Sequence, residues 1–184
     1  SIKLSNTPEF KRGIMKNLFS VEGKVAIVTG GSRGIGEMIA AGYLANGAKV
    51  YISSRKADAC IATAARLVDE FGGECIPISA DLSNLDGINN FVQEFSKHET
   101  SLDILVNNAG VAWGAPLEEF PELGWDKVMN TNVKGVFFLT QQLLQHLQEN
   151  TTPENPAHVI NVGSVDGIKT PVFDNFSYGP SKAA

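Results

Sequence analysis

The sequence predicts an α/β fold with a doubly wound parallel sheet, and two observations indicate it. Short β-branched runs alternate with longer segments of helical periodicity from Lys24 onward, and this alternation is typical of βαβ units. Each β-branched run is also almost continuously apolar, as expected for strands that are covered on both faces. Right-handed crossovers between such strands place helices on both faces of one sheet.

Five strands and four long helices follow one another along the chain. Gly47 and Gly72 follow two of the helices, at positions where helix C-caps favour glycine. The predicted strands are residues 25–28, 50–53, 75–79, 104–107 and 158–162, and the predicted helices are residues 34–46, 57–71, 85–97 and 123–148.

We expect one domain over residues 21–184, preceded by a flexible arm over residues 1–20 that is basic and lacks periodicity. A further helix, which carries Tyr178 and Lys182, begins only at the end of the sequence. A helix this short is marginal in water without support. We therefore expect that the C-terminal part of the fold is missing from this chain; the alternative is that another element orders this helix.

The composition argues against several classes of protein. With 43% hydrophobic residues, 19% charged residues and a net charge of -5, the chain resembles a folded domain and offers no electrostatic reason to bind nucleic acid or an anionic membrane. Cys60 and Cys75 match neither a disulfide framework nor a metal site, so we predict no metal and a reducing compartment. We expect a soluble, cytoplasmic protein; the basic arm leaves a mitochondrial presequence as the alternative.

A glycine-rich turn connects the first predicted strand to the first predicted helix. Its sequence is T-G-G-S-R-G-I-G, and its position between a strand and a helix is the context in which such turns bind dinucleotides in Rossmann-type folds. The glycines allow a tight turn and a close approach to a pyrophosphate, and the helix start offers free N–H groups to the anion. An ordinary glycine-rich loop is the alternative. The predicted cofactor-binding residues of this turn are Gly30, Ser32, Arg33, Gly34, Ile35 and Gly36.

The residues after the second strand indicate which dinucleotide binds. Sites for NAD usually carry an acid about 20 residues beyond the glycine turn, whereas this sequence has Arg55 and Lys56 there and no acid before Asp58. Arg55 can bind a 2′-phosphate with two hydrogen bonds, and Arg33 can add a second charge. We therefore predict NADPH/NADP+ as the cofactor. The alternative is that Arg55 is a solvated surface charge.

Two further segments follow strands, where ligands of open α/β sheets collect. Asp81 follows the third strand and could accept a hydrogen bond from an adenine, although capping of the next helix is an equally good explanation. An N-N-A-G turn follows the fourth strand and could lie beneath the adenosine. The predicted cofactor contacts of these segments are Asp81, Leu82, Asn108, Ala109 and Gly110.

Near the end of the chain, Tyr178 and Lys182 form the motif Y-G-P-S-K. The four-residue spacing places the two side chains on one face of a helix. A free phenol has a pKa of about 10, and an adjacent ammonium makes a phenol more acidic because it stabilises the phenolate. Such a pair can supply the proton that a carbonyl oxygen needs when hydride reaches its carbon. A surface pair on a helix is the alternative.

Five motifs in this order resemble short-chain dehydrogenases/reductases. They are T-G-G-S-R-G-I-G, N-N-A-G, M-N-T-N-V-K-G, N-V-G-S-V and Y-G-P-S-K, and they extend from Lys24 to Ala184. More narrowly, G-G-S-R-G-I-G, D-I-L-V-N-N-A-G and Y-G-P-S-K-A-A resemble bacterial 3-oxoacyl-[acyl-carrier-protein] reductases, especially the type associated with rhamnolipid biosynthesis. The resemblance therefore implies an NADP-dependent oxidoreductase.

The resemblance also assigns roles to residues. It implies that Ser164 hydrogen-bonds the substrate carbonyl, that Tyr178 donates the proton, and that Lys182 holds the nicotinamide ribose besides acidifying Tyr178. Asn132, on a face expected to be buried with Trp125, would distort its helix and hold a water that relays protons to Lys182; a purely structural polar contact is the alternative. Family members commonly form tetramers through their fifth and sixth helices, so a homo-oligomer is expected.

The substrate is the least specified part of the prediction. Apolar side chains in two loops near the expected cofactor mouth favour an acyl or ring-bearing substrate, although ordinary loop packing explains them equally well. We expect reduction of a 3-oxoacyl thioester to its 3-hydroxyacyl form, either as a small molecule or on an acyl carrier. The alternatives are a free ketone, diketone or ketose, or a nucleotide-binding scaffold without turnover. The apolar loop residues are Trp113, Pro116, Leu117, Val172, Phe173 and Phe176.

Overall fold

The computed structural model describes residues 19–169 and 173–184. The expected arm over residues 1–20 lies outside the described residues except for its last two positions, and so does Val172 of the predicted substrate loops. Among the described residues, no helix is both long and apolar enough to cross a membrane.

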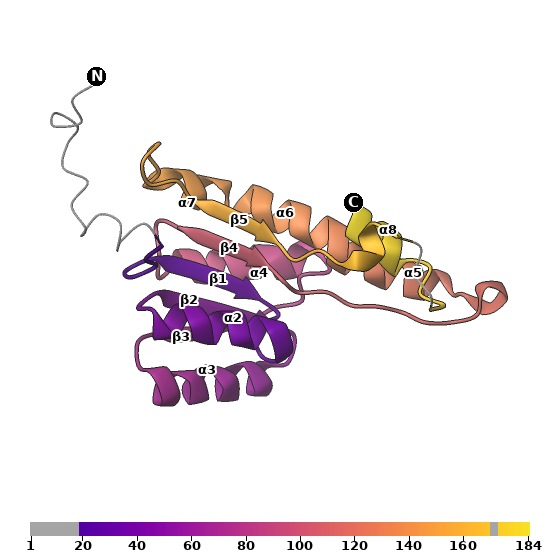
Figure 1. Ribbon diagram of the computed structural model, residues 1–184, viewed down its shortest axis with the longest axis horizontal. Coiled ribbons are helices and arrows are strands. Elements are labelled where there is room, and N and C mark those ends of the chain that lie inside the picture. Colours follow the sequence, from indigo (N-terminus) through magenta and orange to yellow (C-terminus); the bar gives the residue numbers. More distant parts are fainter. Residues whose placement is uncertain (1–18, 170–172) are drawn as a thin grey trace, which may run out of the picture.

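The fold is built on a five-stranded parallel sheet in the order β3-β2-β1-β4-β5 (Figure 1). Val28 of β1 lies opposite Ile52 of β2 on one side and Val106 of β4 on the other. The strand order reverses between β1 and β4, and ligands of doubly wound sheets bind at such a switch point. The predicted fold class is confirmed. The strands are β1 (Val25–Thr29), β2 (Lys49–Ser54), β3 (Cys75–Ser79), β4 (Ile104–Asn107) and β5 (His158–Asn161).

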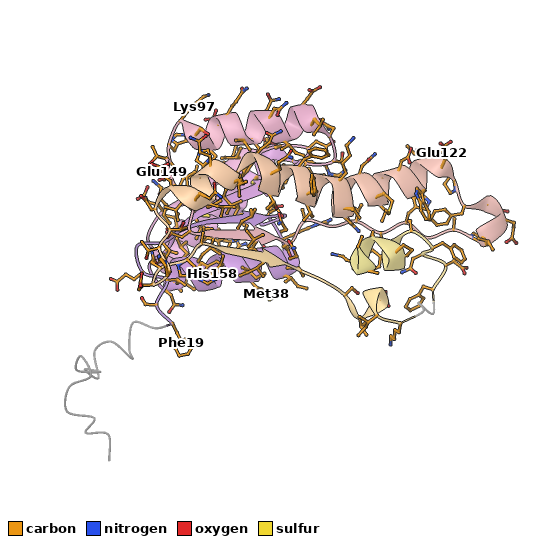
Figure 2. All side chains as sticks on the ribbon, turned by 90° about the horizontal axis from the view of Figure 1, so that it is seen from above. Phe19, Met38, Lys97, Glu122, Glu149 and His158 are labelled. Atoms are coloured by element: carbon orange, nitrogen blue, oxygen red, sulfur yellow. The ribbon has the colours of Figure 1, made fainter. Side chains whose placement is uncertain are left out.

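Helices cover both faces of the sheet (Figures 1 and 2). On one face, α2 (Gly34–Ala45) and α3 (Ala57–Phe71) bury residues such as Leu44 and Leu67 against Val28. On the other face, α4 (Leu85–Ser96), α6 (Gly135–Gln142) and α7 (Leu144–Glu149) bury Phe91 and Leu139 against Ile27. Because successive strand residues point to opposite faces, covering both faces explains the nearly continuous apolar runs in β1, β2 and β4.

The predicted helix over residues 123–148 is wrong as a single element. The structure divides it into α5 (Glu122–Met129), a π-helical turn η3 (Asn130–Lys134), α6 and α7. At η3 the N–H of Gly135 donates to the carbonyl of Asn130, which is the wider hydrogen-bond spacing of a π-bulge, a feature common at functional sites. A second interruption falls at Leu143, where ψ is -1°.

The buried face of this helical segment also differs from the prediction. Val128 and Asn132 are buried as expected, but Trp125 is 42% exposed. The buried stripe instead runs through Gly124, Val128 and Asn132, at the four-residue spacing of one helix face. Trp125 is one position away from that stripe and therefore turns toward solvent.

The last strand contradicts the expectation that every strand is covered on both faces. All four residues of β5 are exposed, including Val159 and Ile160 at 43% each. The physical reason is that β5 is an edge strand, paired only with β4, and the described helices pack over the centre of the sheet. β3, at the other edge, is also incompletely buried.

A lobe extends beyond the carboxyl ends of the strands, at the right of Figure 1. It contains the far end of α5, the short turns η2 (Leu117–Glu119) and η4 (Val165–Gly167), and α8 (Tyr178–Ala183). The predicted helix carrying the Y-G-P-S-K motif therefore forms and begins at Tyr178. An ideal Cβ on Gly167 would lie 2.5 Å from the carbonyl oxygen of Lys182, so only a glycine lets η4 pack this closely on α8.

Candidate active site

The glycine turn is shaped by close contacts that exclude side chains. Gly30 and Gly34 have φ values of +66° and +58°, in the region that favours glycine. An ideal Cβ on Gly36 would lie 2.4 Å from Asn108 Nδ2 and 2.4 Å from the Gly30 carbonyl oxygen. The first turn of α2 therefore packs directly on the turn that precedes it and on the end of β4.

Thr29 joins the glycine turn to the N-N-A-G segment and was missed by the sequence analysis. Its Oγ1 accepts hydrogen bonds from the backbone N–H groups of Asn108 (3.0 Å) and Ala109 (2.9 Å) and donates to the carbonyl of Val106 (3.2 Å). These three bonds use one donor and two acceptor positions, the full capacity of a hydroxyl. The Asn108 side chain returns a bond to the Thr29 carbonyl at 2.9 Å. The available signal was a threonine immediately before the turn.

Two exposed arginines lie in and near the glycine turn. Arg33 lies inside it, and Arg55 follows β2. The N–H of Gly31 donates to the carbonyl of Ser53 at 3.1 Å, which fixes the turn against the end of β2 and brings the two arginine-bearing loops to the same edge of the sheet. Ile35 is 58% exposed on the same turn.

The structure decides against one of the two interpretations of Asp81, which follows β3. Asp81 Oδ1 accepts bonds from the N–H (3.1 Å) and the hydroxyl (2.7 Å) of Ser83. The N-cap of α4 is Asn84, whose Oδ1 accepts the Gly87 N–H at 2.8 Å. Helix capping by Asp81 is therefore wrong, and its adenine contact stays a prediction. Leu82 is 8% exposed with its side chain in the core, so only its backbone can face a ligand.

The predicted catalytic pair, Tyr178 and Lys182, lies together on α8. Lys182 Nζ is 5.8 Å from the centroid of the Tyr178 ring, and it donates a hydrogen bond of 2.8 Å to the carbonyl of Val162, just beyond β5. Burial lowers the pKa of Lys182 below its ordinary value. An ideal Cβ on Gly110 would lie 3.6 Å from Lys182 Nζ and 3.5 Å from Asn132 Oδ1. The end of the N-N-A-G segment therefore meets both polar groups.

Asn132 uses its side chain to connect three segments. Its Oδ1 accepts the Val111 N–H, and its Nδ2 donates to the Val111 carbonyl and to Ser181 Oγ, each at 2.9 Å. Both amide hydrogens are therefore engaged by the protein. A water relay through this residue would have to use the second lone pair of Oδ1 or the main-chain carbonyl.

Ser181 was not among the predicted site residues. It is 4% exposed, accepts the bond from Asn132 and donates to the carbonyl of Tyr178 at 2.7 Å. It therefore joins the π-helical turn to the first turn of α8. The sequence contained the signal, because Ser181 lies inside the Y-G-P-S-K motif.

Ser164 begins the η4 turn beside α8. Its Oγ accepts the Asp166 N–H at 3.2 Å, which engages a lone pair and leaves the hydroxyl hydrogen for a ligand acceptor. The structure thus places Lys182 beside Tyr178 on α8 and joins Asn132 to that helix through Ser181. It brings Ser164 to the same helix through the packing of Gly167 on the Lys182 backbone.

A cavity of about 550 Å³ lies between α6, β5 and α8. Lys182 and Asn132 line one side of it, but Phe137, Leu144 and Val159 line the other. We do not assign it as the substrate site, because it extends from the strand ends along α6, α7 and β5. Ligands of this fold bind instead outside the carboxyl ends of the strands.

The predicted substrate loops meet at those carboxyl ends. The N–H of Ala115 donates to the carbonyl of Asp174 at 3.0 Å, and the rings of Phe120 and Phe176 meet edge to face at 5.7 Å. Leu117 and Phe173 remain 69% and 77% exposed. Loop packing therefore explains Phe176 in part, whereas the side chains of Leu117 and Phe173 remain exposed apolar surface.

Trp113 is explained by local packing. An ideal Cβ on Gly124 would lie 2.6 Å from its ring, and Lys127 Nζ lies 5.2 Å from the ring centroid. Pro116 precedes η2 as its N-cap.

Comparison with known families agrees with this geometry. A model of the short chain dehydrogenase family matches residues 24–184. The chain belongs to that family. It is 52% identical over 170 residues to a rhamnolipids biosynthesis 3-oxoacyl-[acyl-carrier-protein] reductase from Pseudomonas aeruginosa, an alignment that covers 92% of this chain and 66% of that protein. The predicted resemblance is confirmed, both to the short-chain dehydrogenase family and to this type of reductase.

Two further comparisons show what share of each chain is covered by the similarity. The Pseudomonas aeruginosa RhlG/NADP active-site complex superposes with a TM-score of 0.86 at 52% identity, covering 90% of this chain and 64% of that one. A gluconate 5-dehydrogenase from Gluconobacter oxydans is 36% identical over 149 residues, covering 81% of this chain and 56% of that protein. The chain thus spans less than two thirds of the length of these short-chain dehydrogenase relatives.

Proposed function

We propose that this chain is the cofactor-binding and catalytic part of an NADPH-dependent carbonyl reductase. The observation that carries the proposal is the ammonium of Lys182, 5.8 Å from the Tyr178 ring centroid, at the same edge of the sheet as a glycine turn flanked by arginines. The 52% identical RhlG was solved as an NADP complex, which supports the choice of cofactor.

The residues of the chain fit this cofactor. Without a Cβ, Gly30 and Gly36 let the turn pack closely on Asn108 and Ala109, and the start of α2 beside this turn offers backbone N–H groups that a pyrophosphate would bind. Arg33 and Arg55 bind the 2′-phosphate. The remaining contacts assigned to the dinucleotide come from Ser32, Gly34, Ile35, Asp81, Leu82, Asn108, Ala109, Gly110, Tyr178 and Lys182.

When bound, NADPH supplies the hydride that reduces the carbonyl carbon. Tyr178 donates a proton to the carbonyl oxygen, and Ser164 holds that oxygen by the hydroxyl hydrogen that its turn leaves free. Lys182 stabilises the phenolate that Tyr178 becomes, while Asn132 holds the π-helical turn against α8. Positioned donors of this kind contribute a rate factor of about 10²–10⁴.

The substrate we propose is a 3-oxoacyl thioester, reduced to the 3-hydroxyacyl form. The exposed side chains of Leu117 and Phe173 would contact its acyl chain. The name of the Pseudomonas aeruginosa relative, a 3-oxoacyl-[acyl-carrier-protein] reductase, supports this choice.

A free ketone is the second candidate, because of the charge near the substrate loops. Glu118, Glu119 and Glu122 are exposed on η2 and at the start of α5. Coenzyme A and phosphopantetheine both carry phosphate, and carboxylates near the entrance disfavour anionic carriers.

Oxidation of NADPH, followed by its absorbance with acetoacetyl-coenzyme A and with a panel of neutral ketones, tests the proposal. Turnover of the thioester supports the first candidate, and turnover of neutral ketones alone supports the second. Tyr178→Phe should lower turnover at least about 100-fold while NADPH affinity changes less than twofold. A protein that binds NADPH and reduces nothing would be a scaffold, and equal efficiency with NADH would overturn the cofactor assignment.

A further inference from the structure

The glycine turn receives a hydrogen bond from a helix that follows it in sequence. Thr63, on α3, donates from Oγ1 to the carbonyl of Ser32 at 3.0 Å, and Thr63 is only 7% exposed. A buried hydroxyl needs such a partner. The acceptor lies 31 positions earlier in the chain, between Gly31 and Arg33, so the bond fixes a turn that has few side chains of its own.

This bond orients the backbone N–H of Arg33. The carbonyl of Ser32 and the N–H of Arg33 belong to one peptide plane, and in a trans peptide the two groups point in opposite directions. With the carbonyl directed at Thr63, the Arg33 N–H points away from α3. The backbone at Arg33 is extended, with φ -167° and ψ 163°, and α2 begins at the next residue.

The same helix also positions the second arginine. α3 begins at Ala57 with Lys56 as its N-cap, directly after Arg55. Arg66, one turn beyond Thr63, forms a 2.6 Å salt bridge with Glu37 of α2. α3 therefore follows directly on the loop that carries Arg55 and contacts α2 through Arg66, while Thr63 bonds the glycine turn itself.

We propose that Thr63 is a positioning residue that sets the preference for NADPH over NADH. It holds the Ser32–Arg33 peptide so that Arg33 stays at the spacing from Arg55 that a 2′-phosphate requires. The inference rests on the proposed function, because it assumes that both arginines bind this phosphate. Thr63 itself touches no ligand.

Three variants separate this role from a general effect on folding. Thr63→Val removes the donor while nearly preserving shape, Thr63→Ala removes it without β-branching, and Thr63→Ser keeps the hydroxyl. Dissociation constants for NADPH and NADH are measured by titration of each purified protein, together with kcat at saturating NADPH and the melting temperature.

Thr63→Val and Thr63→Ala should weaken NADPH binding by about three- to tenfold, the usual effect of one lost hydrogen bond. NADH binding should change less than twofold, kcat should stay constant, and Thr63→Ser should match the wild type for both nucleotides. In an Arg33→Ala background, Thr63→Val should add no further loss, because the two residues then act through one group.

Equal weakening of NADPH and NADH would show a merely structural role, and unchanged NADPH affinity in both Val and Ala variants would also overturn the inference. If the Val or the Ala variant of Thr63 fails to fold, the remaining one still tests the inference, as does the comparison of Arg33→Ala with and without a substitution at Thr63. Failure of the proposed function looks different, because the wild type itself would then show no preference for NADPH.

Discussion

Two regions of this chain are built by different contacts. We call β1 to β3 with the glycine turn, α2 and α3 the cofactor half, and β5 with the lobe beyond the strand ends the substrate half. In the cofactor half, β1 and β2 are almost fully buried, and the glycine turn is held by Thr29, Ser53 and Thr63. In the substrate half, β5 is exposed along its whole length and Phe173 is 77% exposed. Figure 2 shows the substrate lobe projecting beyond the helices that cover the sheet.

The difference teaches where each half obtains its specificity. The cofactor half acts through backbone groups, so its geometry depends on glycines and on hydroxyls that fix carbonyls and N–H groups. Under the proposed function, the substrate half would act through its exposed apolar side chains, such as those of Leu117 and Phe173. Adding a Cβ to a tightly packed glycine of the first half should therefore be severe, and changes in the second half should be mild and selective for the substrate.

Gly36→Ala should produce the largest effect in the cofactor half. Its Cβ would lie 2.4 Å from Asn108 Nδ2 and from the Gly30 carbonyl oxygen, so α2 or the turn must move. We expect NADPH affinity, measured by titration, to fall at least about 100-fold, which corresponds to about 2.7 kcal/mol. Gly42→Ala is the matched control in the same helix, because its Cβ meets nothing within 4 Å, and it should stabilise the fold by up to about 1 kcal/mol. Similar behaviour of both variants would break the comparison.

Asn132→Ala and Ser181→Ala test the link between the two halves. Each leaves a buried polar group without its partner, which costs about 1–3 kcal/mol, so thermal unfolding should show a melting temperature lower by about 2–12 °C. Turnover should fall about tenfold or more for each. Because the two residues share one bond, the double variant should lose less than the sum of the single losses. Normal turnover by a folded Asn132→Ala protein would leave Asn132 a purely structural role.

Phe173→Ser should act on the substrate alone. The side chain is largely exposed, so stability should stay within about 0.5 kcal/mol of wild type. The KM for a long-chain substrate should rise about tenfold, since burying a large apolar side chain contributes about 1.5–3 kcal/mol. Ile61→Ser, at a 56% exposed position of α3, is the control and should leave KM unchanged. An equal rise in KM for short and long substrates would contradict an acyl-chain contact.

The smallest effect is expected when the native protein is treated with an alkylating reagent that targets Cys60 and Cys75 in the cofactor half. Burial raises the pKa of the Cys75 thiol to about 12 and also raises that of Cys60. At pH 8 the reactive thiolate of Cys75 is then only about one part in 10⁴. Alkylation by iodoacetamide, followed by mass spectrometry, should be negligible in the native protein and complete at both thiols in denaturant. Rapid native labelling would show that this half opens more easily than its packing suggests.

Much of the fold could be predicted because βαβ periodicity is local. The strands fell within two residues of their predicted ends, and Gly47 and Gly72 adopt the positive φ expected beyond helices. Periodicity did not indicate the break at Asn130–Lys134, where Asn132 bonds to Val111 and Ser181; only the family resemblance implied a distorted helix at Asn132. The exposure of β5 depends on its position in the sheet, which its apolar sequence does not encode.

The residues of the candidate site also differ in how well the sequence predicts them, because some belong to local motifs and others depend on contacts between distant segments. Glycines, the arginines and the Tyr178–Lys182 pair have characteristic spacing in sequence. Thr29, Thr63 and Ser181 act by fixing backbone groups of distant segments, and a hydroxyl in sequence gives little indication of which carbonyl it will meet.

The bond from Lys182 to the carbonyl of Val162 has a consequence for the order of events. An ammonium has three hydrogens, and folding commits one of them to the main chain. The long side chain is therefore immobilised before any ligand binds. The entropic cost of fixing its rotamer, up to about 2 kcal/mol, is incurred during folding and not during ligand binding. Two hydrogens remain, enough for the ribose and the water that the proposed function assigns to this residue, so its side chain is already oriented for that role in the folded chain.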